Sequence, residues 1–168
     1  ILPQDGPNLI LMDWPTPLKG AVIQDGKTYA EIAHIAQTPP AFIAIGNYLS
    51  GNGLSAPAIY AADIGKGLLL LEDLGREGVL DEAGNPIAER YLESVACLAR
   101  LHALKTPGIL PVDDSETYSI PGFDRAAMKV EVSLLIDWYL PWKRGSAASQ
   151  DERDEYFAIW DDLIDQLA

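Results

Sequence analysis

The stretch Gly67–Gly75, GLLLLEDLG, joins an apolar run to two acidic residues. The four leucines Leu68–Leu71, bounded by glycines, predict a strand that is buried on both faces. The switch to Glu72 and Asp73 marks the point where this strand leaves the core. Backbone N–H and C=O groups at such a point are free to pair with a flat polar ligand, but a buried strand that simply ends at the surface has the same pattern.

The residues on which other enzyme classes depend do not occur in recognisable patterns. The sequence has no G-x-x-x-x-G-K-[ST] phosphate loop, no H-E-x-x-H zinc motif, no G-x-S-x-G nucleophile motif and no pair of cysteines. Its two histidines, His34 and His102, are expected to be structural, exposed or capping residues rather than catalytic ones. A metal site built from carboxylates alone stays open in so acidic a chain, but no spacing points to one.

The charge of the chain narrows the classes of partner. A net charge of −13 argues against nucleic acid and against an anionic membrane surface, because both require a basic face on the protein. No apolar run reaches the roughly 18–20 residues of a membrane span, and no signal peptide is visible. The single cysteine, Cys97, fits a reducing compartment and is expected to be a small core residue. We therefore expect a cytoplasmic protein that acts on a small molecule, and the oligomeric state stays open.

Elements that could position the leucine strand lie before it in the chain. Asn8–Trp14 and Ala58–Ala62 have the pattern of strands, and with Leu68–Leu71 they predict an antiparallel sheet of at least three strands. A helix that begins at Pro39-Pro40 and ends at Asn52-Gly53 is expected to cover one face of this sheet.

Capping signals predict where two other helices begin. Thr28 and Glu31 have the spacing of a capping box, and the helix that they begin is expected to continue to Gln37. Ser149 and Glu152 have the same spacing at the start of a last helix.

The second half of the chain is predicted to be mainly helical. The segment Lys105–Pro121, with three prolines and no apolar period, is expected to be a loop. The helix before it opens at Pro86 and is expected to bury the face formed by Ile87, Tyr91, Val95, Leu98 and Leu101.

The helix after this loop is expected to begin at Asp124 and to stop at Pro141. Its core stripe is predicted to consist of Ala127, Val130, Leu134 and Trp138. We further expect Trp138 and Trp160 to share one apolar cluster with Leu98 or Leu101.

Several segments, in order, resemble one family of enzymes. LLLLEDLG is similar to the hinge strand of the aminoglycoside phosphotransferase and choline kinase-like group of small-molecule kinases. Asn8–Pro15, Gly53–Ala62 and Glu93–His102 resemble the strand, the helix-to-strand turn and the first large-lobe helix of the same group. Phe123–Pro141, which ends in EVSLLIDWYLP, resembles a helix of the branch that phosphorylates the bacterial cell-wall sugars N-acetylmuramate and N-acetylglucosamine.

The resemblance implies an α+β, protein-kinase-like fold. Residues 1–75 would be a partial N-terminal nucleotide-binding lobe with the hinge, an antiparallel sheet plus a helix. Residues 76–168 would be the helical beginning of the C-terminal lobe. The residues that would bind ATP lie on the upstream strand and the hinge: Ile10, Met12, Leu71, Glu72, Asp73 and Leu74.

Two expected phosphate-binding features of the family are missing. Met12 stands where the resemblance places a lysine, and no acidic residue occurs between Pro39 and Leu54, where the partner glutamate would lie. The two absences agree, because the loss of one partner would leave the other as an unpaired buried charge.

The resemblance also implies the reaction, which is transfer of the γ-phosphoryl group of ATP, with Mg²⁺, to a hydroxyl of a sugar or aminoglycoside-like molecule. The family's His-x-Asp catalytic loop is absent, since Ala36 and Leu104 stand two residues after the histidines. We expect the catalytic and metal-binding residues to lie outside these residues, in a longer protein, and this chain alone to be inactive. A non-catalytic, kinase-like binding or regulatory module is the alternative, and an α+β domain unrelated to kinases stays open.

Overall fold

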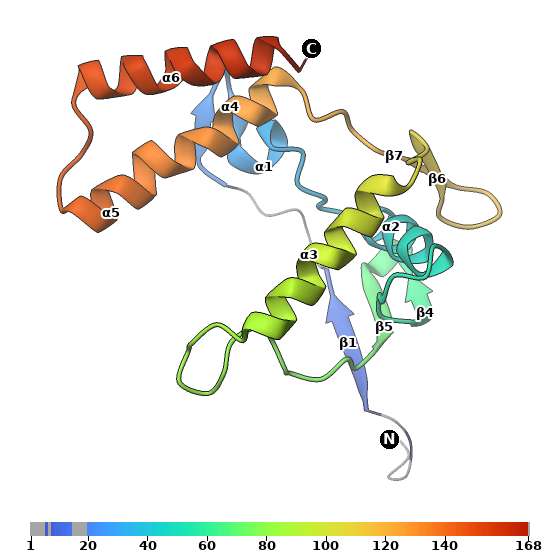
Figure 1. Cartoon of the computed structure of the whole chain (residues 1–168). Coiled ribbons are helices and arrows are strands. Elements are labelled where there is room, and N and C mark those ends of the chain that lie inside the picture. The colour runs from blue at the N-terminus through green and yellow to red at the C-terminus, as the bar shows by residue number, and fades with distance from the viewer. Residues whose placement is uncertain (1–5, 7, 15–19, 168) are drawn as a thin grey trace. The chain divides into compact units, whose positions relative to one another are not determined.

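The computed structural model describes residues 6, 8–14 and 20–167 (Figure 1). The described chain divides into two compact units. The first, which we call the sheet unit, contains residues 6, 8–14 and 37–120, and the second, the helical unit, contains residues 20–36 and 121–167. The chain is thus a mixed α+β protein with small antiparallel sheets and several helices. The predicted lobes, 1–75 and 76–168, stay a prediction.

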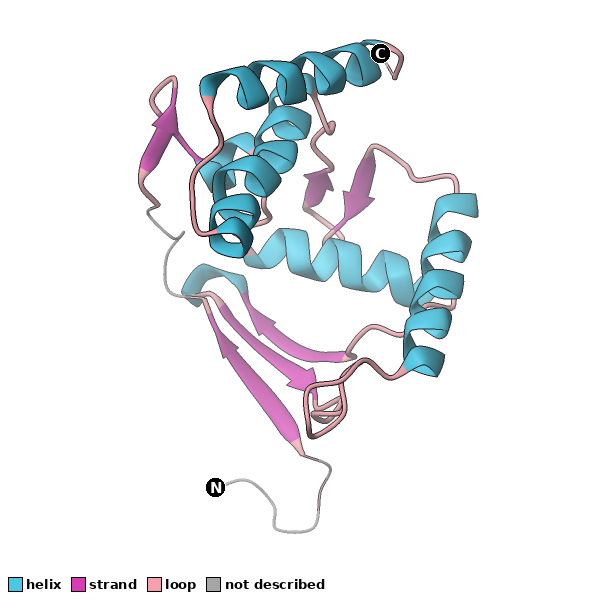
Figure 2. Cartoon of the chain, turned by 60° about the vertical axis from the view of Figure 1, so that its left-hand side comes forward, coloured by secondary structure: helices cyan, strands magenta, loops and turns pink. Residues whose placement is uncertain are grey.

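The leucine strand is the central strand of a three-stranded antiparallel sheet, as the sequence predicts. This strand, β5 (Leu68–Glu72), lies between β1 (Leu9–Asp13) and β4 (Ile59–Asp63), and Figure 2 shows the three side by side. Leu69 and Leu71 are 0% and 3% exposed. Leu68 and Leu70, whose side chains point to the other face, are only half-buried. The expectation of burial on both faces is therefore wrong, because no second helix covers the other face within the described chain.

Gly67 allows β5 to start directly beside the end of β1. Its φ of +71° lies in the left-handed region, and a Cβ atom there would come within 2.2 Å of the carbonyl oxygen of Trp14. The Trp14 N–H donates to the Gly67 carbonyl oxygen at 2.8 Å. Only glycine fits this close approach without strain.

The predicted helix α2 (Pro39–Gly51) covers one face of the sheet. It has proline in its first turn and ends at Asn52, as expected. Ile43 and Ala44 of α2 form the core of the sheet unit with the buried leucines of β5.

The segment predicted as a loop contributes to the same core. It contains a small hairpin of β6 (Ile109–Pro111) and β7 (Thr117–Ser119), and Leu110 and Val112 are 3% and 7% exposed. Asp113 closes the hairpin, since its Oδ1 accepts the N–H groups of Ser115 at 2.7 Å and of Glu116 at 2.8 Å. Strands of three residues are too short to give a periodic signal, and the loop prediction was wrong for this reason.

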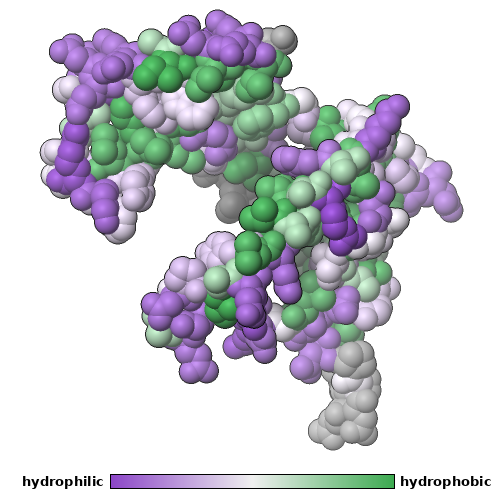
Figure 3. All heavy atoms as spheres, viewed as in Figure 1, coloured by the Kyte–Doolittle hydropathy of each residue, from purple (hydrophilic) through white to green (hydrophobic). Residues whose placement is uncertain are grey.

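The long helix α3 (Ala88–Ala103) forms near the predicted start, but its apolar face is open to solvent. Figure 3 shows apolar residues along its visible side. Tyr91, Val95 and Leu98 are 44%, 63% and 51% exposed, and Cys97 is exposed as well. The expectations of a buried stripe and of a core cysteine are wrong for the described chain, in which no element covers this face.

The helical unit begins with a hairpin and a short helix. β2 (Val22–Gln24) and β3 (Lys27–Thr28) are joined by Asp25-Gly26, whose positive φ angles of 49° and 76° suit a tight hairpin turn. The capping box of Thr28 and Glu31 is confirmed at the start of α1 (Tyr29–Ile32).

The helix α1 ends well before the expected Gln37. His34 adopts a left-handed φ of 54°, and the Ile35 N–H donates to the Ala30 carbonyl oxygen at 2.9 Å. This 6→1 bond around a left-handed residue is the Schellman arrangement that terminates helices.

One continuous helical segment of the helical unit consists of α4 (Arg125–Leu134), a π-helical turn, η2 (Leu135–Tyr139), and α5 (Leu140–Arg144). Asp124 caps it as predicted, since its side chain accepts the Ala127 N–H at 2.9 Å. The helix continues past Pro141. The core stripe fails at the π turn, where Ile136 is 3% exposed and Trp138 is 73% exposed. A π turn has more residues per turn, so a stripe drawn at α-helical spacing does not extend across it.

The last helix, α6 (Gln150–Asp165), begins with the predicted capping box of Ser149 and Glu152. Trp160 is half-buried next to Tyr156, with ring centroids 6.3 Å apart. Because Trp138 is exposed, the expected cluster of both tryptophans is wrong. No helix of the described residues is both long and apolar enough to cross a membrane.

Candidate functional site

The predicted hinge begins at Glu72, and this residue is fixed to β4. The Glu72 N–H donates to the Ala58 carbonyl oxygen at 2.9 Å, and its carboxylate accepts the Ala58 N–H at 3.0 Å. The Glu72 N–H is therefore occupied by the protein itself. The side chain acts as a clamp that fixes the end of the strand.

The next two residues carry the open backbone groups. Among the described residues, none forms a backbone–backbone hydrogen bond with Asp73 or Leu74. The Asp73 carboxylate accepts the Gly75 N–H at 2.9 Å, so this short loop has a defined shape, and Leu74 is 57% exposed. A donor and an acceptor in a row on an ordered loop can bind the edge of a planar heterocycle. That a cleft faces these groups stays a prediction.

The strand register places two of the other predicted nucleotide contacts at the same end of the sheet. Ile10 lies directly across from Leu71, next to Glu72, and it remains 44% exposed. Met12 lies across from Leu69 and packs against the core cluster. The structure thus places Ile10 beside the predicted hinge residue Glu72, whereas the Leu71 side chain belongs to the buried core cluster and the Met12 side chain packs against that cluster.

The Met12 environment accounts for the missing lysine. A lysine at this position would bring an ammonium group beside the apolar core of the sheet unit, with no carboxylate on α2 to pair with it. An unpaired charge in such surroundings is costly, whereas a thioether fills the space without this penalty.

The sheet unit contains a pocket of about 600 Å³, which is not lined by the predicted hinge residues. It is lined mainly by apolar side chains from α2, the end of α3 and the segment after it, with His102 at its rim: Ile45, Tyr48, Leu49, Leu101, His102, Leu104, Thr106, Leu110 and Ile120. None of the six predicted nucleotide-binding residues lines it.

A second pocket, of about 520 Å³, lies within the helical unit and has a different chemistry. Its walls come from the β2–β3 hairpin and from the facing sides of α4, η2 and α6. Charged and polar side chains alternate there with apolar ones, and we call it the polar pocket: Ile23, Gln24, Lys129, Val130, Ser133, Asp137, Arg153 and Phe157.

The polar pocket was not predicted from the sequence, although a signal was present. Lys129, Ser133 and Asp137 are spaced four residues apart, directly beside the apolar stripe of their helix. Arg153 and Phe157 have the same spacing on α6. Residues four apart share one face of an α-helix, so the spacing indicates which polar groups of one helix lie together, but it does not show that they line a cavity. Asp137 lies in the π-helical turn, where this spacing no longer holds strictly.

The ring of Phe157 lines the polar pocket beside two cationic side chains. The Arg153 guanidinium lies 5.5 Å and the Lys129 ammonium 5.9 Å from the ring centroid, both within cation–π range. Arg153 also donates to the Asp137 carboxylate. The two cations are thereby held at defined positions beside an aromatic surface.

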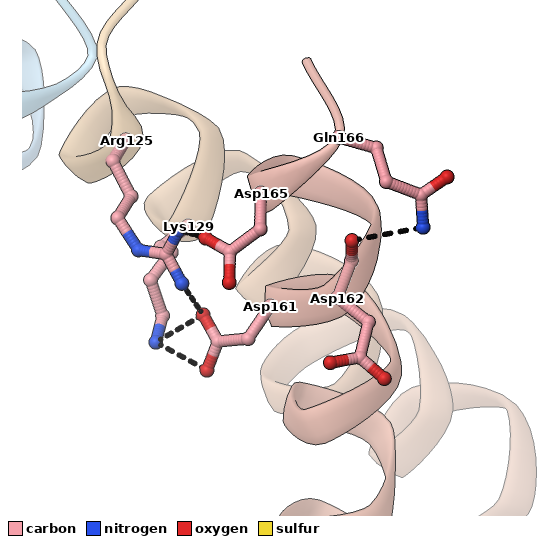
Figure 4. Close-up of polar contacts among 6 residues, drawn as sticks. All are labelled: Arg125, Lys129, Asp161, Asp162, Asp165 and Gln166. Carbon is pink, nitrogen blue, oxygen red and sulfur yellow. Dashed lines mark hydrogen bonds and ion pairs between the residues drawn. The ribbon is translucent and has the colours of Figure 1, made fainter. Parts of the chain in front are cut away.

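Lys129 belongs to a cluster of ion pairs with Asp161, Arg125 and Asp165, which fixes the position of its ammonium group (Figure 4). The Lys129 ammonium lies 3.0 Å from Asp161, whose carboxylate is also 2.6 Å from Arg125. Arg125 bonds Asp165 as well. The hydrogen bond from Lys129 is the main reason why the pKa of Asp161 is lowered. These side chains are a third or more exposed, so the cluster contributes to orientation more than to stability.

Two contacts hold the hairpin side of the pocket onto α4. The Tyr29 hydroxyl donates to Glu131 at 2.7 Å, and this bond raises the pKa of Tyr29. The His34 ring lies 3.1 Å from the Asp124 carboxylate. The pKa of Asp124 is lowered, first by the Ala127 N–H and then by His34. His34 therefore has a structural partner, as the sequence suggested.

No group of three or more His, Cys, Asp or Glu side chains lies close enough together, among the residues that the structure describes, to hold a metal ion. The residues present here do not fit a Mg²⁺ site by themselves.

Comparisons with known proteins give three curated relatives. The chain is 33% identical over 162 residues to the N-acetylmuramate/N-acetylglucosamine kinase of Caulobacter vibrioides. The aligned region covers 90% of this chain and 44% of the relative. It is 30% identical over 127 residues to the Pseudomonas aeruginosa protein of the same name, with 75% and 33% covered. For the Pseudomonas putida protein of that name the identity is 27% over 125 residues, with 74% and 34% covered.

The chain thus spans less than half the length of the curated relatives it matches. All three relatives are named as kinases of amino sugars. No model of a protein family matches the chain, and no solved structure matches it.

Proposed function

We propose that this chain is part of an ATP-dependent kinase that transfers a phosphoryl group to a hydroxyl of an amino sugar. The observation that carries the proposal is the similarity over 90% of the chain to a kinase of N-acetylmuramate and N-acetylglucosamine. The order of the resembling segments supports it, because the hinge-like strand and the EVSLLIDWYLP helix occur in one chain. On this proposal the fold is the kinase-like one, and the location is the cytoplasm.

The geometry of the sheet edge supports a role in nucleotide binding. Asp73 and Leu74 present unengaged backbone groups, and Ile10 lies exposed beside Leu71. Each backbone hydrogen bond to adenine is worth about 0.5–1.5 kcal/mol net, so this edge would supply weak binding and a fixed orientation. Stabilisation of the phosphates needs positively charged groups, whereas the side chains of Glu72 and Asp73 at this edge are acidic.

The chemistry of phosphoryl transfer requires a group that orients the acceptor hydroxyl and ligands for Mg²⁺. Within the part of the chain that the structure describes, no group of His, Cys, Asp or Glu side chains forms such a metal site. In this proposal those groups belong to further residues of the whole protein, and the 168-residue chain alone has no activity.

The proposal is tested with two proteins, the 168-residue chain and a chain extended to the length of its relatives. ATP turnover is measured with N-acetylmuramate, N-acetylglucosamine and an aminoglycoside as acceptors. We expect the extended protein to phosphorylate at least one amino sugar and the short chain to be silent. Turnover by the short chain would contradict the proposal that the catalytic groups lie outside these 168 residues.

A kinase-like binding module is the second candidate, and a specific observation favours it. Met12 stands where the resemblance places a lysine and packs against the core cluster, and α2 carries no acidic residue. A protein of this kind would bind nucleotide or sugar without turnover. Silence of the extended protein across all acceptors, with measurable ATP binding, would support this candidate against the enzyme.

A further inference from the structure

We propose that the polar pocket of the helical unit binds the acceptor sugar of the kinase. The inference rests on the proposed function and adds to it where the acceptor sugar binds and which side chains bind it. The pocket's volume of about 520 Å³ suits a monosaccharide, since small-molecule sites measure about 300–1,000 Å³.

The Arg153–Asp137 pair offers both kinds of hydrogen-bonding group to a sugar. One amino group of Arg153 bonds one oxygen of Asp137, and the two side chains are 34% and 33% exposed. Among the described residues, none bonds the other amino group of Arg153 or the other oxygen of Asp137. A hydroxyl donates and accepts at once, so two vicinal hydroxyls can bind this fixed donor–acceptor pair together.

The Phe157 ring offers the apolar part of the same surface. It is half-buried, and Ile23 and Val130 are the other apolar side chains that line the pocket. A sugar ring has patches of C–H groups between its hydroxyls, and an aromatic side chain provides a matching rigid surface. Polar pairs around one aromatic ring therefore fit an amphipathic ring better than a purely apolar ligand.

The charge balance of the pocket favours a sugar over a polyphosphate. Arg153 is paired with Asp137, and Lys129 is paired with Asp161, so neither cation is uncompensated. The chain as a whole carries −13 charges. A group with several negative charges would have to compete with these aspartates, whereas a neutral polyol binds the pairs without changing the charge.

The test uses the extended protein, ATP and N-acetylglucosamine. Arg153→Gln removes the donor of the pocket, and Phe157→Leu removes its aromatic surface. The matched control is Arg144→Gln, which breaks the comparable exposed pair with Glu152 outside the pocket. Circular dichroism and thermal melting check that each variant is folded.

We expect Arg153→Gln to raise the KM for the sugar by at least about tenfold, the loss expected for one hydrogen bond to a charged group. Phe157→Leu should raise the sugar KM in the same direction. The KM for ATP should stay unchanged in both, and the control should alter neither constant. Folded variants with an unchanged sugar KM would overturn the inference and leave the kinase proposal intact.

A second measurement needs no substitution. Phenylglyoxal modifies accessible arginines, and mass spectrometry then gives the rate at each site. We expect N-acetylglucosamine to slow the modification of Arg153 and to leave that of Arg144 unchanged. Equal rates with and without sugar would overturn the inference. Absence of sugar phosphorylation by the unaltered protein would contradict the proposed function, and the protection at Arg153 still decides whether the pocket binds the sugar.

Discussion

Asp73 and Leu74 are the two residues on which the proposed nucleotide contact depends. Their backbone groups are unengaged among the described residues, and the Asp73 side chain shapes the loop by accepting the Gly75 N–H. Neighbouring Glu72 is different, because its own N–H and carboxylate are both bonded to Ala58. At Leu74, two substitutions can therefore separate the contribution of the side chain to ATP binding from that of the backbone N–H.

The change Leu74→Pro removes the backbone N–H while keeping an apolar residue. If this N–H binds adenine, the dissociation constant for ATP should rise roughly 2- to 13-fold, which corresponds to about 0.5–1.5 kcal/mol. Isothermal titration of the extended protein with a non-hydrolysable ATP analogue measures the change. Leu74→Ala, which keeps the N–H, should bind almost as the unaltered protein does; an equal loss in both variants would point to the side chain instead.

At the scale of the elements, a capping box stabilises the start of α6. The Glu152 carboxylate accepts from Arg144 at 2.7 Å and from the Ser149 N–H at 2.7 Å. The hydrogen bond from Arg144, followed by those from Ser149, lowers the pKa of Glu152 from 4.5 to about 2. A carboxyl group whose pKa is lower in the folded state stabilises the fold above its unfolded pKa, and this contribution is lost as the pH falls toward the folded value.

The variant Glu152→Gln removes this titration. At neutral pH the variant should melt at a lower temperature than the unaltered chain, because the charge-assisted bonds are lost. The difference should be constant above about pH 5 and should shrink as the pH falls from 4.5 toward about 2, where Glu152 itself becomes protonated. Melting temperatures of both proteins over this pH range test the expectation. A difference that does not depend on pH would show that packing, not charge, explains the loss.

The elements that were predictable from the sequence are those with local signals. Both capping boxes and the glycine-bounded leucine strand depend on residues within a few positions of each other, and the structure confirms them. The early end of α1 and the π turn that exposes Trp138 depend on backbone conformations that residue types do not specify. The sequence thus predicts the elements better than it predicts their ends and faces.

The same distinction applies to the candidate sites. The hinge edge follows from one continuous stretch, Gly67–Gly75, and its strand was placed correctly. The polar pocket needs the β2–β3 hairpin close to α4, and the helix α1 that directly follows the hairpin is bonded to α4 by Tyr29 and Glu131, which lie 102 residues apart. Contacts this distant in sequence are set by the tertiary fold, and a local pattern indicates only which residues share a helix face.

At the scale of the whole molecule, the chain exposes apolar surface that globular proteins usually cover. On α3, Tyr91, Val95 and Leu98 are all more than two-fifths exposed, and on the η2–α5 segment Trp138 and Trp142 are 73% and 75% exposed. Contiguous patches of this kind mark surfaces that contact something else. Since the chain spans 44% of its Caulobacter relative, we expect a longer protein to cover the face of α3.

The substitution Val95→Glu tests this expectation in both lengths of the protein. In the 168-residue chain Val95 is 63% exposed, so the free energy of unfolding should change by no more than about 0.5 kcal/mol, as for other surface substitutions. In the extended protein the same carboxylate would be buried without a partner, and the loss should reach several kcal/mol, on the order of the cost of other unpaired buried polar groups. Urea unfolding of the four proteins gives both differences, and Glu93→Gln, on an exposed position of the same helix, is the control for a change of charge. An equally small effect in both lengths would mean that the α3 face remains open, as a docking surface would require.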